Sequence, residues 1–347
     1  LVFLLSDTTF DIHFRRFKSR IYLLSVLMKK FLLKILIFLL PIILLGYFVD
    51  LFISTNLRKS NLYAQKEYPT WNAILEGKLD ANILIYGSSR AWVHFDPKII
   101  EDSLQQPAYN LGIDGHTFNM QYLRHLLTLE NNPKPKLIIH SIDIGTLEKG
   151  NLYNADQFLP YMLWDKTFYE YLSKYKGFTY LDFKIPLMRY YGKWDAIRTS
   201  IEMLIIPRIN QPQRIRGYQG QNKTWNQDLD KAREKMTKYV IKFDKPSAIL
   251  FDQYLKECKE QQIEVILVYP PIYIEGQEFI ANQDEIIQGF QAFADKYDFM
   301  FLDYSDDELC LNKDYFYNAS HMNKTGAELF TKKLCTEIKK QENISLH

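Results

Sequence analysis

The sequence predicts an α/β protein, a three-layer α/β/α sandwich around a parallel sheet, preceded by one N-terminal transmembrane helix. Three observations support this fold class. Short apolar runs alternate with amphipathic stretches, a run of 23 mostly apolar residues lies near the N-terminus, and 47 % of the 347 residues are hydrophobic. That composition supplies enough apolar material for a core and excludes a disordered or low-complexity chain.

The apolar runs have the length and continuity of strands that are buried on both faces of a sheet. They are residues 83–86, 137–139, 265–268 and 299–302. A further short strand is expected at Tyr109 and Asn110, directly before a glycine-rich turn. Helices are expected at residues 97–104, 120–129, 248–261 and 285–296 and at the C-terminus. Strands that alternate with helices pair in parallel through right-handed crossovers, and ligands then bind beyond the carboxyl ends of the strands.

Residues 31–53 form the candidate membrane segment, interrupted only by Lys34 and Asp50. Its length suits a hydrocarbon layer of roughly 30 Å at about 1.5 Å per residue. Lys29, Lys30 and Lys34 place its N-terminal side in the cytoplasm. No small-residue cleavage site follows the run, so we expect an uncleaved signal anchor over residues 28–54, with a removed signal peptide as the alternative. This predicts a single-pass protein of the bacterial cytoplasmic membrane whose main domain is extracytoplasmic, either periplasmic or on the cell surface.

The remaining chain divides by composition. Residues 1–27 precede the first methionine, and we expect either an upstream extension of the gene model without a fold or a short cytoplasmic tail. Residues 55–80 are polar with scattered aromatics and predict a stalk that leads into a first helix. Residues 81–347 form the main domain, with an aromatic-rich insertion at about 150–245 between the third and fourth expected strands. The aromatic side chains fit either a roof over the active face or a core of the insertion's own.

Charge and cysteine content exclude several functions. The chain has 43 Lys+Arg against 41 Asp+Glu, a net charge of +2, which gives no reason to expect a nucleic acid as partner. Three cysteines are too few for a zinc ribbon or a disulfide framework. His94, His116 and His140 lie at spacings that match no known ligand set. We therefore predict neither a metal nor a cofactor.

Three short blocks carry candidate chemistry. Gly87-Ser88-Ser89 follows an expected strand, where a glycine permits a sharp turn and a serine is exposed near backbone N–H groups that can stabilise an oxyanion. The second block runs from Asn110 to Gly115, and the third holds Asn318 and His321 just ahead of the C-terminal helix. Taken alone, a Gly-Ser-Ser turn after a strand also fits an ordinary loop.

In this order the blocks resemble the SGNH/GDSL hydrolase superfamily, particularly its membrane-anchored, exported branch related to proteins that handle acyl groups on cell-surface polymers. The resemblance covers residues 80–145 and 263–340 and leaves the insertion unmatched. It implies a flavodoxin-like α/β/α fold of the SGNH type. It also implies that Ser89 is the nucleophile, that the Gly115 N–H donates to the oxyanion, and that His321 is the general base.

Two positions depart from the pattern of that family. Asn318 stands where the family has an aspartate, so the group that orients His321 can keep a hydrogen bond but lacks a charge. Asp143 stands in the block where the family has an asparagine that donates to the oxyanion, and an ionised carboxylate cannot take that role. A carboxylate from elsewhere could support His321, with Asp314 or Asp143 as the candidates. For Asp143 a simple cap at the end of a strand is the alternative.

Arg90, Asn110 and Asp143 are the candidate substrate-binding residues. Arg90 beside the nucleophile would either bind an anionic substrate or pair with a carboxylate that holds the loop. Asn110 belongs to the second block, and Asp143 follows the strand at residues 137–139.

The expected function is an exported, membrane-anchored serine esterase or O-acyltransferase acting on O-acyl groups, expected to be acetyl, of an envelope glycan or polymer. Its partners would be the acylated polymer, the membrane through the N-terminal helix, and a membrane-embedded acyl-donor protein. The alternative is a weakly active or inactive envelope protein of the same fold that binds polymer or assists a membrane acyltransferase. Asn318 and Asp143 favour the alternative, whereas the joint presence of Ser89, Gly115 and His321 favours the enzyme.

Overall fold

The computed structural model describes residues 5–205 and 214–341, and its centre is a five-stranded sheet in the order β2-β1-β3-β4-β5. All four pairings between neighbouring strands are parallel. The strands are β1 (Ile83–Tyr86), β2 (Ala108–Asn110), β3 (Leu137–Ser141), β4 (Glu264–Tyr269) and β5 (Met300–Asp303). The expected strands are confirmed to within two residues at each end, because side chains buried on both faces leave an uninterrupted apolar run in the sequence.

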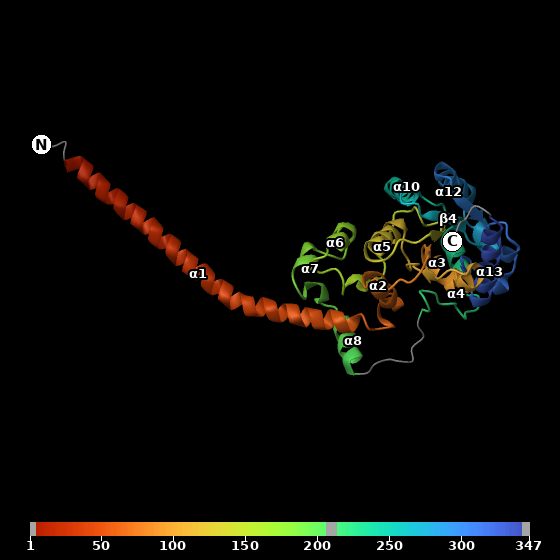
Figure 1. The fold of residues 1–347 in the computed structure, drawn as a ribbon, viewed down its shortest axis with the longest axis horizontal. Helices are drawn as coiled ribbons and strands as arrows, with labels where there is room; N and C mark the ends of the chain where they lie inside the picture. Colours follow the sequence, from red (N-terminus) through yellow and green to blue (C-terminus); the bar gives the residue numbers. More distant parts are fainter. Residues whose placement is uncertain (1–4, 206–213, 342–347) are drawn as a thin grey trace.

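Helices cover both faces of the sheet, so the predicted three-layer α/β/α sandwich is confirmed (Figure 1). Alternate strand residues point to opposite faces and define two cores. Leu84 and Ile138 pack with the first set of helices, whereas Ile83 and Ile139 pack with the second. The first set is α2 (Tyr68–Leu75), α5 (Phe118–Asn131), α10 (Lys245–Glu260) and α12 (Gln283–Tyr297), and the second is α3 (Ser89–His94), α4 (Pro97–Leu104) and α13 (Lys324–Lys340).

Helix starts follow the capping residues. Helix α4 has the predicted bounds, and its N-cap Asp96 accepts a hydrogen bond from the Lys98 N–H at 2.8 Å. Helices α5, α10 and α12 begin two or three residues before the predicted positions, because their N-caps are Thr117, Asp244 and Asn282. At Asp244 the carboxylate accepts from the Ser247 N–H, which satisfies one of the free donors of the first helical turn.

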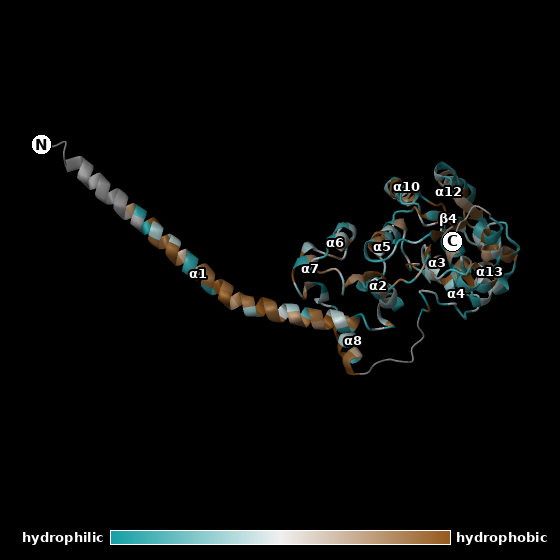
Figure 2. Ribbon diagram, in the orientation of Figure 1, coloured by the Kyte–Doolittle hydropathy of each residue, from teal (hydrophilic) through white to brown (hydrophobic). Residues whose placement is uncertain are grey.

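Helix α1 (Leu5–Leu57) is the longest element and projects away from the domain (Figure 1). Among the described residues one segment, Arg20–Leu57, is long and apolar enough to cross a membrane, and a signal sequence would pass the same test. Figure 2 shows the hydrophobic stretch of α1 ahead of its junction with the domain. The expectation that residues 1–27 have no fold does not hold for residues 5–27, which continue the helix because no glycine or proline interrupts them.

The end of α1 belongs to the domain, so residues 55–80 do not begin with the stalk expected from their polarity, although the helix into which that stalk was expected to lead is present as α2. Asp50 is buried and receives a hydrogen bond from Arg189 of the insertion at 2.6 Å. The chain then passes through η1 (Tyr63–Lys66) into α2, where Tyr68 and Trp71 are fully buried. Polar groups in this segment form tertiary hydrogen bonds; for example, Trp71 Nε1–H donates to Gln157 Oε1 at 2.9 Å.

The insertion has two parts with different neighbours. The first consists of η2 (Ala155–Phe158), α6 (Lys166–Leu172), α7 (Tyr180–Lys184), η3 (Met188–Tyr190) and α8 (Trp194–Ile205), and α8 packs on α1 (Figure 1). Phe158, Phe168 and Phe183 are buried in it, which favours the prediction that many of its aromatics form a core. The second part, with α9 (Asp228–Lys235), crosses to the carboxyl end of the sheet.

A buried ionic cluster fixes this arrangement. Glu67 lies between Arg124 of α5 and Arg214 of the insertion, with both distances 2.7 Å and all three side chains almost fully buried. Burial alone would raise the pKa of Glu67, but the two guanidinium groups lower it below its usual value. The carboxylate therefore stays charged and holds together the α1–α2 connection, α5 and the insertion.

Candidate active site

The turn after β1 presents Ser89 at the carboxyl end of the sheet. Gly87 has a φ of +140°, and a Cβ there would lie 2.6 Å from the Ser141 carbonyl oxygen and 2.9 Å from Ala91 Cβ. Only glycine allows the chain to turn so close to β3. Ser88 then occupies the N-cap position of α3, with its hydroxyl turned to Asp143, and Ser89 is the first residue of the helix.

His321 reaches Ser89 from the other end of the chain. After β5 the chain passes through η4 (Glu308–Leu311), η5 (Lys313–Tyr315) and the hairpin of β6 (Phe316–Asn318) and β7 (His321–Met322). The His321 Nε2 lies 2.8 Å from Ser89 Oγ, although 232 positions separate the two residues. This distance suits proton transfer from a serine to an imidazole base.

Asn318 sets the tautomer of His321. Its Oδ1 accepts hydrogen bonds from the backbone N–H groups of Ser320 at 3.1 Å and His321 at 2.9 Å, so the oxygen rather than the NH₂ group must face them. The same Oδ1 lies 3.0 Å from His321 Nδ1. Because an amide oxygen can only accept, this contact favours a proton on Nδ1 and a free lone pair on Nε2 facing Ser89; the Ser320 hydroxyl, also 3.0 Å from Nδ1, then acts as a second acceptor. The Asn318 amide orients the imidazole as the aspartate of a Ser-His-Asp triad does, but it carries no negative charge to stabilise the imidazolium.

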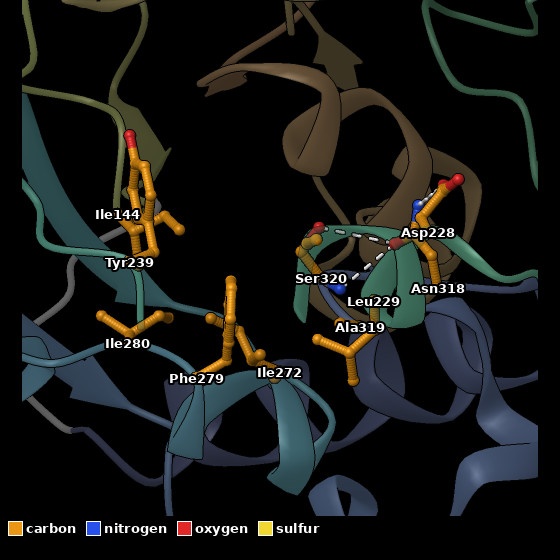
Figure 3. Close-up of a pocket in the computed structure, with 12 residues that line it drawn as sticks. Ile144, Asp228, Leu229, Tyr239, Ile272, Phe279, Ile280, Asn318, Ala319 and Ser320 are labelled. Carbon is orange, nitrogen blue, oxygen red and sulfur yellow. Dashed lines mark hydrogen bonds between the residues drawn. The ribbon is translucent and has the colours of Figure 1, made fainter. Parts of the chain in front are cut away.

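Asp228 places a carboxylate next to Asn318, on the side of the amide that faces away from His321. The sequence analysis did not identify this residue. The Asn318 Nδ2 donates to Asp228 Oδ2 at 3.4 Å (Figure 3). Asp228 is the first residue of α9, 90 positions away in the unmatched insertion. Asp314 and Asp143, the candidates from sequence, make no contact with His321 or Asn318 in the described part of the chain. No local pattern marks Asp228, because its position depends on how the insertion folds back.

The surroundings of His321 favour its neutral form. Burial, and after it the positive charges of Arg90 and Lys223, lower the pKa of His321 to about 3, against a smaller opposite effect of Asp228. Tyr317 stacks on the imidazole with ring centres 5.4 Å apart, and Lys223 Nζ lies 5.1 Å from the centre of the Tyr317 ring. At neutral pH the imidazole is thus an unprotonated base.

His94 accepts a hydrogen bond from the β6–β7 hairpin and so fixes its position. The Met322 N–H donates to His94 Nε2 at 2.9 Å, and the His94 and His321 rings meet edge to face. His94 is fully buried, and burial holds its pKa well below the usual value. A neutral His94 is required, because a protonated Nε2 could not accept the Met322 hydrogen bond. His94 is therefore a positioning residue for the base.

The backbone N–H groups of Ser89 and Gly115 are the candidate donors to an oxyanion. In the described part of the chain, neither the Ser89 nor the Gly115 N–H donates a hydrogen bond. The loop before Gly115 is fastened to the nucleophile turn, since the Ile113 N–H donates to the Gly87 carbonyl at 3.0 Å. Gly115 has a φ of +68°, and a Cβ there would lie 2.8 Å from Cγ of Tyr153. A glycine at this position satisfies both the backbone and the ring above it.

The polar groups of Asn110 and Asp143 are engaged within the protein, which corrects the prediction for these two residues, whereas Arg90 engages its Nη2 and leaves Nε and Nη1 buried without a hydrogen-bond partner. Asn110 is fully buried, donates to the carbonyls of Ala91 and Phe95 at 2.8 Å each, and accepts from the Gly112 N–H. It joins the second block to α3 and does not face a substrate.

Arg90 is buried and donates through Nη2 to the carbonyl oxygens of Pro270 and Pro271, at 2.5 and 3.2 Å. It holds the loop after β4, as the loop-holding alternative expected, but with carbonyl partners instead of a carboxylate. Asp143 accepts from the Ser88 hydroxyl and from the Gly145 N–H. It caps the end of β3 and ties the nucleophile turn to it.

A largely apolar cavity of about 340 Å³ opens beside Asn318 and Ser320 (Figure 3). Asn318, Ser320 and Asp228 lie at one end of it. The rest is lined by apolar groups from α9, from the segment around α11 (Ile274–Glu278) and from Ile144. Neither Ser89 nor His321 is among its lining residues, so the cavity adjoins Asn318 and Ser320, which contact His321 Nδ1.

The described residues contain no cluster of three or more metal-ligating side chains. His116 and His140 are buried at separate places, and burial lowers their pKa values to about 4 and about 3. His140 binds Tyr254 and Gln121 within the core.

No protein-family model matches the chain, and no curated protein matches it. Among solved structures, it is similar to a Bacteroides fragilis protein described as a "putative acylhydrolase", with 12 % identity over 78 % of this chain and 95 % of that chain and a TM-score of 0.34. It is also similar to a GDSL-like lipase from Bacteroides thetaiotaomicron, with 13 % identity over 79 % and 97 % of the two chains and a TM-score of 0.35. At these TM-scores the likeness carries no weight, so the function rests on the geometry of the site.

Proposed function

We propose that the protein is a serine esterase or O-acyltransferase acting on O-acyl groups, with acetyl as the expected group, of an extracytoplasmic glycan or polymer. The observation that supports it is the hydrogen-bonded series from Ser89 through His321 and Asn318 to Asp228. A protein that only binds polymer has no need for a serine and a neutral imidazole at 2.8 Å with the correct tautomer.

In the proposed mechanism, His321 Nε2 takes the proton of Ser89 as Oγ bonds to the ester carbonyl carbon. The backbone N–H groups of Ser89 and Gly115 receive the oxyanion of the tetrahedral intermediate. When the intermediate collapses, the C–O bond to the leaving alcohol breaks and the alcohol takes the proton from Nε2. Water or a second hydroxyl then attacks the acyl-enzyme, gives its proton to Nε2, and Ser89 regains it. Water yields an esterase and a sugar hydroxyl yields a transferase.

Helix α1 would keep this chemistry outside the cytoplasmic membrane. Its N-terminal lysines favour a cytoplasmic N-terminus, with the domain in the periplasm or on the cell surface. In that setting an acylated envelope polymer is the substrate class within reach. A transferase would also need an acyl donor, for which a membrane-embedded partner protein is the candidate.

Labelling with a fluorophosphonate tests the proposal, because the probe forms a covalent bond only with an activated serine. We expect the full-length protein to be labelled and Ser89→Ala to lose labelling completely. Ser173→Ala, at an exposed serine that follows α6, is the matched control and should label like the unmodified protein. Absence of labelling in folded protein, together with no turnover of acetyl esters, would favour the alternative of a polymer-binding protein without catalysis.

A further inference from the structure

A second cavity lies where α1 meets the insertion, remote from Ser89. It measures about 670 Å³ and is lined by Ile42, Ile43, Leu45, Gly46 and Val49 of α1. Across from them lie Trp164 and the segment 184–187, which begins at the last residue of α7. The size falls within the usual range for ligand pockets, roughly 300–1,000 Å³. Apart from Lys184, every lining side chain is apolar or absent.

Specific contacts join the insertion to α1 beside this cavity. Tyr47 stacks on Trp164 with ring centres 5.4 Å apart, and the Leu187 N–H donates to the Asp50 carboxylate at 2.8 Å. Asp50 also pairs with Arg189, so the groove ends at a buried ionic contact. The groove is therefore a fixed feature of the junction and does not depend on a loose loop.

The position of the groove along α1 indicates what covers it. Residues 31–49 form the mostly apolar stretch between Lys30 and Asp50, interrupted only by Lys34 near its inner end, and at about 1.5 Å per residue these 19 residues span about 28 Å. That length matches a hydrocarbon layer of roughly 30 Å and places Asp50 at its outer boundary. Ile42 lies eight residues earlier, about 12 Å deeper. The groove thus runs along the outer half of the proposed membrane segment.

The rim of the groove has the chemistry of a membrane interface. Trp164 and Ile185 are 55 % and 45 % exposed, and the Lys184 ammonium lies near the rings of Tyr169 and Tyr180. Within the described residues Lys184 forms no ion pair with a carboxylate. Aromatic rings and lysines gather where acyl chains give way to head groups, with the cation directed at phosphate.

We propose that this groove binds a phospholipid of the outer leaflet, with an acyl chain between α1 and residues 184–187 and the phosphate at Lys184. The inference rests on the proposed role of α1 as a membrane anchor. A bound lipid would make the insertion part of the membrane attachment, so the catalytic domain would be held by two contacts and not by a single flexible helix.

Tryptophan fluorescence in vesicles tests the proposal. The full-length protein, in a Trp194→Phe background that removes the exposed Trp194, is reconstituted into phosphatidylcholine and phosphatidylglycerol vesicles whose acyl chains carry bromine, a short-range quencher. We expect strong quenching, reduced by at least half in Trp164→Phe and unchanged in Trp225→Phe. Trp225 is the matched control because it packs on Tyr273, away from α1. Lys184→Glu should lower the preference for phosphatidylglycerol, whereas Lys231→Glu on α9 should not.

Each failure has a distinct meaning. A protein that does not enter vesicles overturns both the anchor and the groove. A protein that enters vesicles while Trp164 is not quenched overturns the groove and leaves the anchor standing. Quenching that grows as the protein is diluted in the bilayer would assign the groove to a second copy of the chain and overturn the lipid. Fluorophosphonate labelling of Ser89 does not depend on Trp164, so failure of the proposed esterase activity is seen separately.

Discussion

The most informative perturbation of the site exchanges charge between Asn318 and Asp228. The imidazole becomes positively charged as Ser89 attacks, and a nearby negative charge stabilises that state. In this protein the nearest carboxylate of the series is Asp228, which acts through the Asn318 amide. Three variants separate the contributions: Asp228→Asn, Asn318→Asp, and the two combined.

The magnitudes follow from the distances. Hydrogen bonds of 3.4 and 3.0 Å in series place the Asp228 charge about 7 Å from the imidazole, where Coulomb attraction amounts to about 0.6 kcal/mol in a water-like environment and about 2.4 kcal/mol at an effective dielectric of about 20. Asp228→Asn should therefore slow attack by about 3-fold to about 60-fold. Because Asp228 is exposed, we expect the lower part of that range and a smaller effect at high salt.

Asn318→Asp brings a charge to about 4 Å from the imidazole, but it also replaces a donor by a carboxylate oxygen 3.4 Å from Asp228 Oδ2. Repulsion between these two carboxylates would cancel much of the gain. The double variant keeps one charge and moves it from about 7 to about 4 Å, which is worth about 0.4–1.8 kcal/mol, or about 2- to 20-fold in rate. The expected order is double variant, then Asn318→Asp, then Asp228→Asn.

The second-order rate of fluorophosphonate labelling measures all variants without knowledge of the natural substrate. Asp230→Asn, at an exposed residue of the same helix, is the matched control and should react like the unmodified protein. The reasoning is refuted if Asp228→Asn and Asp230→Asn behave alike, or if Asn318→Asp alone reacts faster than the double variant.

Three further predictions concern the base, the oxyanion site and the junction with α1. The pKa of His321 is lowered to about 3, so the imidazole stays neutral well below pH 7 and the labelling rate should stay level from pH 8 to 5. With the usual imidazole pKa of about 6.5, the labelling rate would instead fall about 30-fold by pH 5. Gly115→Ala forces a Cβ against Tyr153 and shifts the backbone N–H, which should slow labelling by about 100-fold or more, with partial recovery on adding Tyr153→Ala; full activity of Gly115→Ala would remove this N–H from the mechanism. Asp50→Ala leaves the buried Arg189 without its carboxylate partner and should lower the free energy of unfolding, measured in denaturant, by about 3–5 kcal/mol. Adding Arg189→Met should recover most of this loss. Equal stability of Asp50→Ala, Arg189→Met and the double variant would contradict the buried pair.

The sheet could be predicted from sequence because both of its faces are covered. The residues of β1 and β3 are buried, which leaves short apolar runs that a strand facing water on one side would not contain. The start of α4 was predictable for a similar reason, since Asp96 and Pro97 form a strong local start signal. Of the stalk and first helix expected at residues 55–80, the helix is present as α2, but the stalk is not, because polar residues such as Asn72 and Glu67 bond within the fold and sequence polarity does not distinguish exposed groups from paired ones.

The site was predictable only where its residues sit in short blocks. Ser89, Gly115 and His321 each follow a strand or turn with a recognisable pattern, and the order of the blocks suggested the meeting of Ser89 and His321 before any distance was known. Arg90 and Asn110 flank the same blocks, yet their hydrogen bonds are internal. Position next to a motif does not tell a substrate contact from a group that holds the motif together.

The structure of the insertion was the least predictable from sequence, because its two parts pack against different neighbours. Its first part closes a groove on α1 and pairs Arg189 with Asp50, whereas its second part delivers Asp228 to Asn318. Neither contact has a local signature, because both join residues about 90 to 140 positions apart. The same segment therefore links the proposed membrane attachment to the proposed catalytic base.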